Sequence, residues 1–486
     1  MYKYFVGFVL LINVCVMAQE TSFINDLYFD YSNYKEISLA KKRIKHADII
    51  QLMDKLKENK KFEISKVGKS AQKRDIHLIK YGNGKTKVFL WSQMHGDEST
   101  ATMGLFDIFN FLTAMDRYDD LRKLLNDSLT IYFIPMVNPD GAEVYQRRNA
   151  YDIDINRDYV NKQTPEARML RSVFDTIRAD FGFNLHDQNG SYAAGESPRN
   201  AAISFLAPAV NYNKDITPNR KVAMQVIAAI NKSLKQYIPG HIAKYNDDFE
   251  PRAFGDNFQK EGMSTILIES GGWLNDTEKQ FVRKLNFLAL ISAFINIANS
   301  TYTKYDVKEY ESIPFNKEIF SDVILRSVTL KRGKKQIVAD VAVKRVEKNS
   351  KDYKIGYYES EVDDIGDLTG AYGLEEYDCT GLTLEPGKIF SKTVSKVDTL
   401  EDVDINKIFL EGCTTIQVKK IDDSLAFCKY PINVCSKNKK QIESKVGSPA
   451  DFGLYKDGEL IYIMVNGYLY DPNNETGYIA NGRINR

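Results

Sequence analysis

The chain has 486 residues, with 66 Lys and Arg against 65 Asp and Glu, so its formal net charge is +1. A balance this close to neutral gives no electrostatic reason to expect a nucleic acid partner or an anionic membrane surface. The length predicts two or three domains, and a hydrophobic share of 43% is typical of a globular protein with a sizeable core.

The first 18 residues have the pattern of a secretory signal peptide. Lys3 precedes an apolar run from Phe5 to Met17, and Val16-Met17-Ala18 is a small-residue cleavage pattern. The run is too short for a good membrane span, and Cys15 lacks the preceding small residue of a lipoprotein signal. No later window of about 20 residues reads as apolar. We therefore expect cleavage near Ala18, a secreted or periplasmic location and no stable membrane span.

Residues 19–300 are expected to form one α/β domain. Residues 19–60 read as polar and helical, and strands and helices then alternate, which predicts a mixed, twisted sheet covered by helices on both faces. The expected strands are Lys87–Trp91, Leu129–Ile134, Phe181–His186 and Ser264–Ile268, and the expected helices are one that includes 103–109, Val222–Leu234 and Glu278–Ala298.

Residues 301–486 read differently, as short alternating strands that predict a β-rich accessory domain. Ser327–Leu330, Gln336–Val343 and Lys407–Leu410 are the clearest of these expected strands. Support, oligomerisation or presentation of a substrate are the roles expected for such a domain, and the sequence leaves the oligomeric state open.

Four of the five cysteines lie in this C-terminal third, at Cys379, Cys413, Cys428 and Cys435. An even number in an exported segment is compatible with two disulfides, for which three pairings exist. Free, buried thiols are the alternative, and the spacing does not suggest a zinc site.

The run Lys87–Trp91 is followed by His95-Gly96-Asp97-Glu98. A strand that ends in His-x-x-Glu places an imidazole and a carboxylate on one short turn, where they can hold one cation. Zinc suits such ligands, because a catalytic zinc site needs three protein ligands and a water. Alone the motif is common in exposed loops.

His186 ends a second apolar run, and the carboxyl ends of strands are where open α/β sheets place their sites. The other three histidines, His46, His77 and His241, read as surface or structural residues.

Two loops between these segments carry arginines, Gln146–Ala150 and Asp154–Asp158. A planar guanidinium binds a carboxylate through two hydrogen bonds, so these loops suggest an anionic group on the substrate. Glu269 follows the strand Ser264–Ile268 and precedes Ser270-Gly271-Gly272, a position that suits a general base. A plain glutamate at a strand end is the alternative.

Taken in order, His95-x-x-Glu98, Arg147, Asn156-Arg157, His186 and Glu269 resemble the zinc metallocarboxypeptidases, the funnelin-type peptidases, over residues 40–300. The resemblance implies one Zn²⁺ ion, held by His95, Glu98 and His186.

The resemblance also implies roles for the residues around the ion. Glu269 becomes the general base and acid, and Arg147 the group that polarises the scissile carbonyl, although a one-residue exchange with Arg148 stays open. Asp154 orients His95 through its second ring nitrogen. The residues implied to bind the substrate are Asn156 and Arg157, which would clamp the terminal carboxylate, and Tyr245, the candidate for the family's mobile capping tyrosine.

The expected function is therefore that of an exported zinc metallocarboxypeptidase, which hydrolyses a C-terminal peptide bond by zinc-activated water with Glu269 as general base. Two alternatives of the same fold remain open. One is a muropeptide amidase or endopeptidase of the cell wall, and the other is a zinc deacylase. The substrate is expected to be a peptide or a muropeptide.

Overall fold

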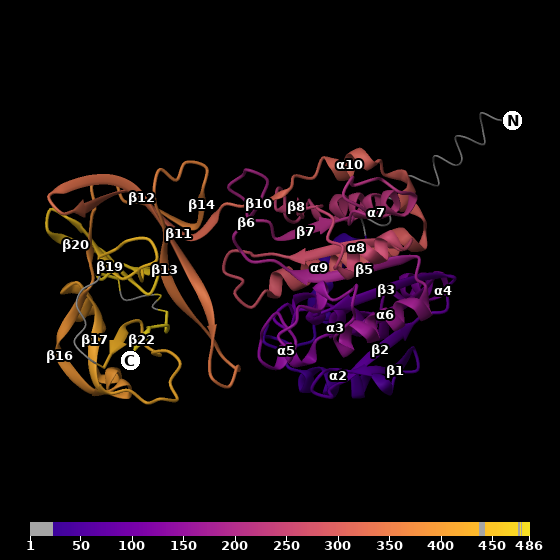
Figure 1. Cartoon of the computed structure of the whole chain (residues 1–486), viewed down its shortest axis with the longest axis horizontal. Helices are drawn as coiled ribbons and strands as arrows, with labels where there is room; N and C mark the ends of the chain where they lie inside the picture. The colour runs from indigo at the N-terminus through magenta and orange to yellow at the C-terminus, as the bar shows by residue number, and fades with distance from the viewer. Residues whose placement is uncertain (1–22, 437–442, 475–476, 478) are drawn as a thin grey trace. The chain divides into compact units, whose positions relative to one another are not determined.

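The computed structural model describes residues 23–436, 443–474, 477 and 479–486, and the expected signal peptide lies outside them. The chain divides into two units, Met1–Glu318 and Ile319–Arg486 (Figure 1). The first unit extends past residue 300, because β10 (Asn316–Glu318) pairs with β6 (Tyr192–Ala194).

The first unit alternates strands and helices along most of its length. Residues 23–30 are helical. The strands that follow are β1 (Phe62–Lys69), β2 (Asp75–Tyr81), β3 (Thr86–Ser92), β4 (Leu129–Ile134), β5 (Phe181–Asp187), β6, β7 (Ile203–Leu206), β8 (Ile242–Lys244), β9 (Ser264–Ser270) and β10. The α-helices are α2 (His46–Lys57), α3 (Thr100–Thr113), α4 (Asp119–Ser128), α5 (Pro139–Glu143), α6 (Pro165–Ile177), α7 (Pro218–Leu234), α8 (Phe254–Lys260), α9 (Gln280–Ala298) and α10 (Val307–Glu311). Short 3-10 turns are η1 (Tyr31–Asn33), η2 (Ile155–Arg157) and η3 (Thr301–Lys304).

Eight of these strands form one sheet in the order β1-β2-β4-β3-β5-β9-β7-β8. The central strands β4, β3, β5 and β9 run parallel, while β1, β2 and β7 supply the antiparallel pairings. The expected mixed sheet is therefore confirmed, and the four strands expected within residues 19–300 lie within β3, β4, β5 and β9.

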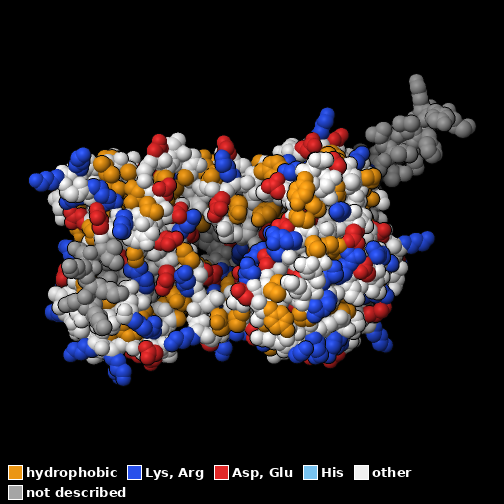
Figure 2. Space-filling model, viewed as in Figure 1, with side chains coloured by type: hydrophobic (Ala, Val, Ile, Leu, Met, Phe, Trp, Pro, Cys, Tyr) orange, Lys and Arg blue, Asp and Glu red, His pale blue; other side chains and the backbone are white. Residues whose placement is uncertain are grey.

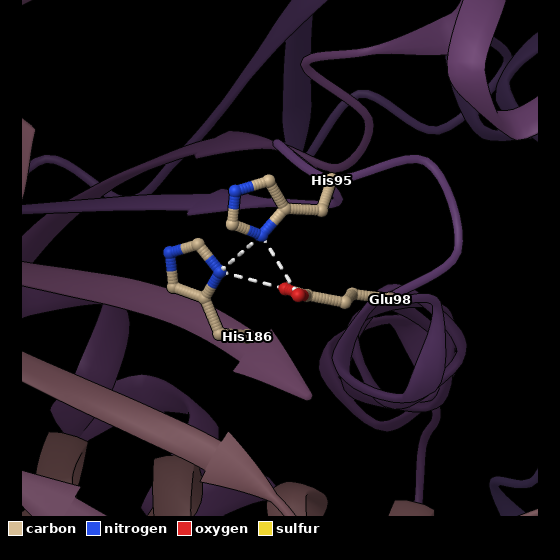
Figure 3. Close-up of side chains that lie close together, drawn as sticks. All are labelled: His95, Glu98 and His186. Carbon is tan, nitrogen blue, oxygen red and sulfur yellow. Dashed lines mark hydrogen bonds and ion pairs between the residues drawn. The ribbon is translucent and has the colours of Figure 1, made fainter. Parts of the chain in front are cut away.

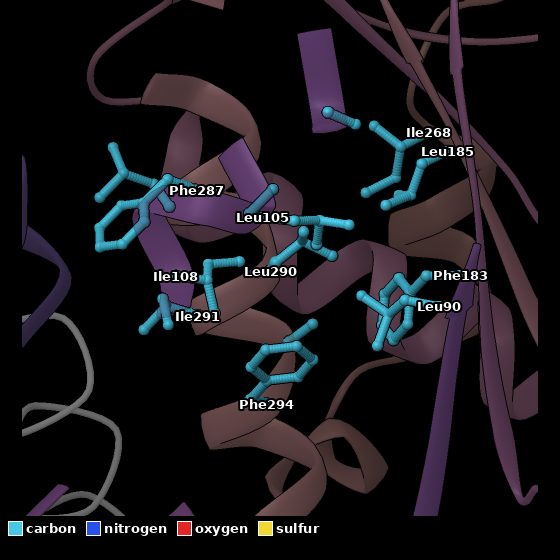
Figure 4. Close-up of a cluster of buried hydrophobic side chains, with 14 of the residues drawn as sticks. Leu90, Leu105, Ile108, Phe183, Leu185, Ile268, Phe287, Leu290, Ile291 and Phe294 are labelled. Atoms are coloured by element: carbon cyan, nitrogen blue, oxygen red, sulfur yellow. The ribbon is translucent and has the colours of Figure 1, made fainter. Parts of the chain in front are cut away.

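Helices cover both faces of this sheet. On one face α3, α7 and α9 pack on Leu90, Phe183 and Ile268 (Figure 4). On the other face α6 and α8 pack on Phe89 and Trp91. Because parallel central strands are buried on both faces, most residues of β3, β5 and β9 are apolar or small. Asn184 is a buried polar residue in the middle of β5, and the titratable side chains of these strands lie at or near the strand ends.

Helix α9 corrects one expectation from the sequence. It is long and apolar enough to cross a membrane, with a mean hydropathy of 1.5 over an 18-residue window. The expectation that no apolar window follows residues 1–18 is therefore wrong. However, 83% of that window is buried inside the protein, where α9 packs against α3 and α7. Burial from all sides explains its apolar composition, since a core helix needs no polar face.

The second unit is built mainly of strands, as expected. Its elements are β11 (Phe320–Arg332), β12 (Lys335–Asn349), β13 (Gly356–Gly366), β14 (Tyr372–Asp378), β15 (Thr383–Pro386), β16 (Lys388–Lys396), η4 (Val397–Asp402), α11 (Ile405–Leu410), β17 (Cys413–Lys420), β18 (Asn433–Cys435), β19 (Phe452–Lys456), β20 (Glu459–Val465), β21 (Tyr468–Tyr470) and β22 (Ile484–Asn485). In its described part an eight-stranded sheet contains β11–β15 and β19–β21, and a four-stranded sheet contains β16, β17, β18 and β22.

The strand expected at Lys407–Leu410 is wrong, because these residues belong to α11. The Asp404 side chain accepts a hydrogen bond from the backbone N–H of Lys407 and caps the helix. The helical turn then buries Ile408 and Phe409 together, which a strand, with its alternating faces, would not do.

The four described cysteines are free and buried. The structure therefore has free thiols, which was the alternative to two disulfides. Burial raises the pKa of the Cys379 thiol to about 12 and that of Cys428 to about 11. Thiols in this state are protonated at neutral pH and poorly reactive.

We predict that iodoacetamide at neutral pH leaves all four thiols unmodified in the folded protein, because they are buried and the alkylating species is the thiolate. After denaturation without reductant, all four should be alkylated. Peptide mass spectrometry checks both states, and a cysteine that stays blocked in the denatured, unreduced protein would instead indicate a disulfide.

Most charged side chains lie at the surface, where Figure 2 shows both signs interspersed, but Arg283 and Asp107 are fully buried. Arg283 of α9 forms an ion pair with Asp107 of α3, with Nε and Oδ2 2.7 Å apart. The same arginine donates to the carbonyl oxygens of Glu36 and Leu39, and Asp107 accepts from the Tyr31 hydroxyl. This pair therefore joins the N-terminal segment to both helices.

We predict that Arg283→Met destabilises the first unit by about 3–5 kcal/mol, because it leaves the Asp107 carboxylate buried without its counterion. Urea unfolding followed by tryptophan fluorescence measures this, since both tryptophans, Trp91 and Trp273, lie in the first unit. Lys123→Met, which removes an exposed ion pair with Asp127, is the control and should leave the transition unchanged. Equal transitions for both variants would contradict the prediction.

Candidate metal centre and active site

The turn after β3 positions His95 and Glu98. The chain leaves the strand at Ser92, turns through Gln93, which has a φ of 50°, and enters α3 at Thr100. Gly96 lies against α5 so closely that a Cβ would come within 2.1 Å of the Gly141 carbonyl carbon. Only glycine fits there, so the glycine of the motif is a packing requirement that brings His95 and Glu98 inward.

His95, Glu98 and His186 meet at the carboxyl ends of β3 and β5 and the start of α3 (Figure 3). His95 Nδ1 lies 3.2 Å from His186 Nδ1, and each of these nitrogens lies 2.7 Å from an oxygen of Glu98. All three side chains are buried, and they are the one cluster of His, Cys, Asp and Glu in the described residues with the spacing of a metal site.

This donor set fits zinc. Two imidazole nitrogens and one carboxylate are a known catalytic ligand set, and they leave a fourth position for water. Tetrahedral ligands at ~2.0–2.1 Å from zinc lie ~3.3 Å apart, close to the separation of the two imidazole nitrogens. His95 and His186 would therefore bind through Nδ1, with Glu98 as the third ligand.

The charges around the cluster favour a cation. Burial opposes the charged form of Glu98, but the two imidazoles outweigh it and hold the pKa of Glu98 well below its usual range. Burial also lowers the pKa of His186, which keeps this ring neutral as a metal ligand must be. For His95 burial is outweighed by Glu98 and Asp154, which raise its pKa to about 9.

Asp154 lies behind His95, as the resemblance implied. Its Oδ1 is 3.1 Å from His95 Nε2, so Nδ1 is the nitrogen turned toward Glu98. Its other oxygen accepts from Arg147 Nε at 3.0 Å. A carboxylate at the outer nitrogen fixes the ring orientation and increases the basicity of the inner nitrogen.

Arg147, and not Arg148, reaches the cluster. Its Nη1 lies 3.1 Å from His95 Nδ1 and 3.3 Å from Glu98 Oε1. Arg148 points elsewhere and donates to the carbonyl oxygen of Asp152 in its own loop. The loop therefore turns only one of these two adjacent guanidinium groups toward the cluster, that of Arg147.

Glu269 lies beside the cluster because β5 and β9 pair in parallel with His186 directly opposite Glu269. Residues paired in this way project from the same face of the sheet. Glu269 is buried, and its side chain has no hydrogen bond to any other residue that the structure describes. Burial and then the negative charge of Glu98 raise the pKa of Glu269 well above its usual value.

The two residues implied to bind a carboxylate differ in their surroundings. Asn156 is buried, with its Oδ1 accepting from the backbone N–H of Phe254 and its Nδ2 3.4 Å from His186 Nε2. Arg157 is 37% exposed, and its Nε lies 3.2 Å from an oxygen of Glu250. Glu250 also receives two hydrogen bonds from the Arg252 guanidinium. Arg157 is therefore partly accessible, and it has a carboxylate partner within the protein.

Tyr245 follows β8 and is half-buried, and its ring centroid lies 6.4 Å from that of Tyr192 on β6. Burial and the nearby charge of Glu269 raise the pKa of Tyr245, and burial followed by the charges of Glu318 and Glu269 raises that of Tyr192. Both phenols therefore lie near Glu269. No sequence signal selects Tyr192, because β6 has only three residues and no motif.

Asp187 and Lys279 were also missed by the sequence analysis. Asp187 follows His186, and its Oδ2 accepts from Lys279 Nζ at 3.2 Å. The position of Asp187 directly after His186 was a signal that could have been used to select it from the sequence. Lys279 is separated from Asp187 by 92 positions, and only the fold brings them together.

We predict that the protein binds one zinc ion per chain and that Glu98→Gln and His186→Ala each remove it, because two ligands do not hold a structural or catalytic zinc ion. Metal analysis after dialysis measures the bound zinc. His77→Ala, on β2 and outside the cluster, is the control and should keep one ion per chain. Full occupancy in both ligand variants would place the ion elsewhere.

Part of the chain is similar to known zinc carboxypeptidases. The zinc carboxypeptidase family model matches residues 49–243. Carboxypeptidase SOL1 of Arabidopsis thaliana is 26% identical over 103 residues, which are 19% of this chain and 21% of the relative. Carboxypeptidase 2 of Trichophyton tonsurans is 27% identical over 150 residues, 30% of this chain and 27% of the relative. The chain thus aligns with about a quarter of the length of these curated relatives.

Among solved structures, a metallo-carboxypeptidase from Burkholderia cenocepacia aligns over 52% of this chain and 69% of its own, with 17% identity and a TM-score of 0.43. The matched residues 49–243 contain the cluster His95, Glu98 and His186, whereas Glu269 lies beyond them. Over residues 49–243 the chain carries a domain of the zinc carboxypeptidase family, a family of zinc-dependent hydrolases.

Proposed function

We propose that the first unit hydrolyses the C-terminal peptide bond of a peptide, with zinc held by His95, Glu98 and His186. The observation that carries this proposal is the in-register pairing of β5 and β9, which sets a ligand and a buried carboxylate side by side at His186 and Glu269. Zinc held by these three residues would lower the pKa of a coordinated water and would polarise the scissile carbonyl.

Glu269 is the general base in this proposal. Its raised pKa makes it a better proton acceptor than an ordinary glutamate. Its side chain has no hydrogen-bond partner among the described residues. The carboxylate accepts a proton from the attacking water and later transfers it to the nitrogen of the leaving amine. Both transfers use the same side chain, so no covalent intermediate with the protein is needed.

Arg147 stabilises the charge that develops on the carbonyl oxygen. Its Nη1 is aimed at the cluster, and its Nε is held by Asp154, so the guanidinium is positioned before the substrate binds. A donor placed in advance against a developing oxyanion contributes ~3–4 kcal/mol to transition-state stabilisation.

Arg157 is the proposed partner of the substrate's terminal carboxylate. A substrate carboxylate would compete with Glu250 for this guanidinium, and Arg252 can keep Glu250 neutralised when that exchange occurs. The ion pair of Arg157 with Glu250 is also the reason to test the two alternatives, muropeptide cleavage and deacylation. A guanidinium that is already bound by a carboxylate is less selective for a substrate with a free C-terminus.

We propose a secreted or periplasmic location on the pattern of residues 1–18, with cleavage near Ala18. In that location the protein would act outside the cytoplasm, and a peptide and a muropeptide are the two candidate substrates there.

We predict that Glu269→Gln lowers kcat/KM by about 10²–10⁴-fold while bound zinc stays at one ion per chain, because the variant loses a proton acceptor and no ligand. The zinc-loaded protein and the variant receive a peptide with a free C-terminus, its amidated twin, an N-acyl amino acid and a muropeptide digest. Mass spectrometry identifies the products, and Glu58→Gln at the exposed end of α2 is the matched control.

Loss of one residue from the free peptide alone, absent in Glu269→Gln, supports the carboxypeptidase. Cleavage confined to the muropeptides or to the acyl substrate assigns the same site to the corresponding alternative. A zinc-loaded protein that cleaves none of the four would overturn the proposed function.

A further inference from the structure

Lys279 lies immediately before α9, at a φ of 53°, and its side chain is only 18% exposed. Its ammonium group donates three hydrogen bonds, to Ser270 O at 3.0 Å, to Gln188 O at 3.2 Å and to Asp187 Oδ2 at 3.2 Å. An ammonium carries three N–H donors, so all three are used within the protein. A buried lysine with every donor used is a fixed structural element and has no donor left for a substrate.

The three acceptors lie next to the proposed catalytic residues. Ser270 follows Glu269 at the end of β9, and Asp187 and Gln188 follow His186 at the end of β5. The final pair of the two strands is Asp187 opposite Ser270, and the Gln188 N–H donates to the Ser270 carbonyl oxygen at 2.9 Å. Lys279 therefore bonds to both strands at the point where their pairing ends.

Asp187 extends this connection to the third segment of the site. Its Oδ2 also accepts from the hydroxyl of Thr100, the first residue of α3, two positions after Glu98. Its backbone N–H lies 3.3 Å from Glu98 Oε2. The Lys279 ammonium and the Asp187 carboxylate thus connect the three segments that carry Glu98, His186 and Glu269.

The charge of Lys279 makes this arrangement possible. Asp187 has a side chain that is 9% exposed, and a carboxylate buried to this degree needs a counterion and hydrogen bonds. The ammonium supplies both and also binds two strand-end carbonyls. A neutral side chain of the same length would leave the carboxylate without its counterion and would remove the side-chain bridge between the two strand ends, which would then be joined by backbone pairing alone.

We infer that Lys279 is a positioning residue that holds the ends of β5 and β9 together, and so fixes the placement of Glu269 relative to the His95, Glu98 and His186 cluster. The catalytic part of this inference rests on the proposed function. The metal part does not, because the placement of His186 and Glu98 can be measured as zinc affinity alone.

We predict that Lys279→Met weakens zinc binding about 10–100-fold, because residues that support metal ligands have effects of this size. Competition with a chromophoric chelator measures the affinity without any substrate. For the substrate cleaved by the wild-type protein, kcat should fall at least 10-fold with KM nearly unchanged, since Lys279 contacts no substrate. Lys279→Arg, which keeps the charge, should recover part of both losses.

Lys87→Met is the matched control, because Lys87 also donates to a backbone carbonyl oxygen, that of Ile177, but at the opposite end of the sheet. It should leave zinc affinity and kcat unchanged. Lys279→Met leaves the Asp187 carboxylate buried without its counterion. The double variant Lys279→Met with Asp187→Asn removes both charges and is therefore the second variant to be measured.

Wild-type zinc affinity in a folded Lys279→Met protein would overturn the inference, as would failure of both Lys279→Met and the double variant to fold, which would make Lys279 a stability residue. If the wild-type protein binds zinc but cleaves no substrate, the proposed function fails, and the comparison of zinc affinities still decides the role of Lys279.

Discussion

The parallel, in-register pairing of β3, β5 and β9 is the constraint on which the candidate site depends. Ser92 at the end of β3 pairs with Leu185, and the next residue of β5, His186, pairs with Glu269. Because parallel strands end at the same edge, residues separated by 91 and 83 positions meet there without any local motif that links them. A shift of β9 by one residue would turn Glu269 to the opposite face of the sheet.

Around this edge, three buried carboxylates are each compensated by a neighbouring group, whereas the buried Glu269 has no such partner among the described residues. Glu98 lies between two imidazoles, Asp154 between His95 and Arg147, and Asp187 against Lys279. Each carboxylate is held by at least one donor that also touches a neighbouring segment. The polar groups therefore position the site as well as neutralise it, and a single substitution acts on more than one residue.

The core beneath the site keeps these groups rigid. Apolar side chains of β3, β5 and β9 pack against α3 and α9 (Figure 4). Helix α9 also carries the buried Arg283, which binds Asp107 on α3. Lys279 lies immediately before the same helix. The start of α9 therefore supports the site through Lys279, and its buried face supports the core through Arg283. The unusually apolar composition of α9 follows from this central position rather than from a membrane.

The sequence by itself determined the class of fold and singled out His95, Glu98 and His186 as candidate metal ligands, because strands ending in His-x-x-Glu and in His are local signals with a direct chemical interpretation. It also identified Glu269 from its place after a strand, although the partner strand was unknown. It was wrong at Lys407–Leu410, which form a helix capped by Asp404, and it left open the state of the four cysteines, which are free and buried. The choice between Arg147 and Arg148, the ion pair of Arg157 with Glu250, and the link from Lys279 to Asp187 were decided only by the tertiary structure, since each depends on which distant segments the sheet brings within hydrogen-bonding distance.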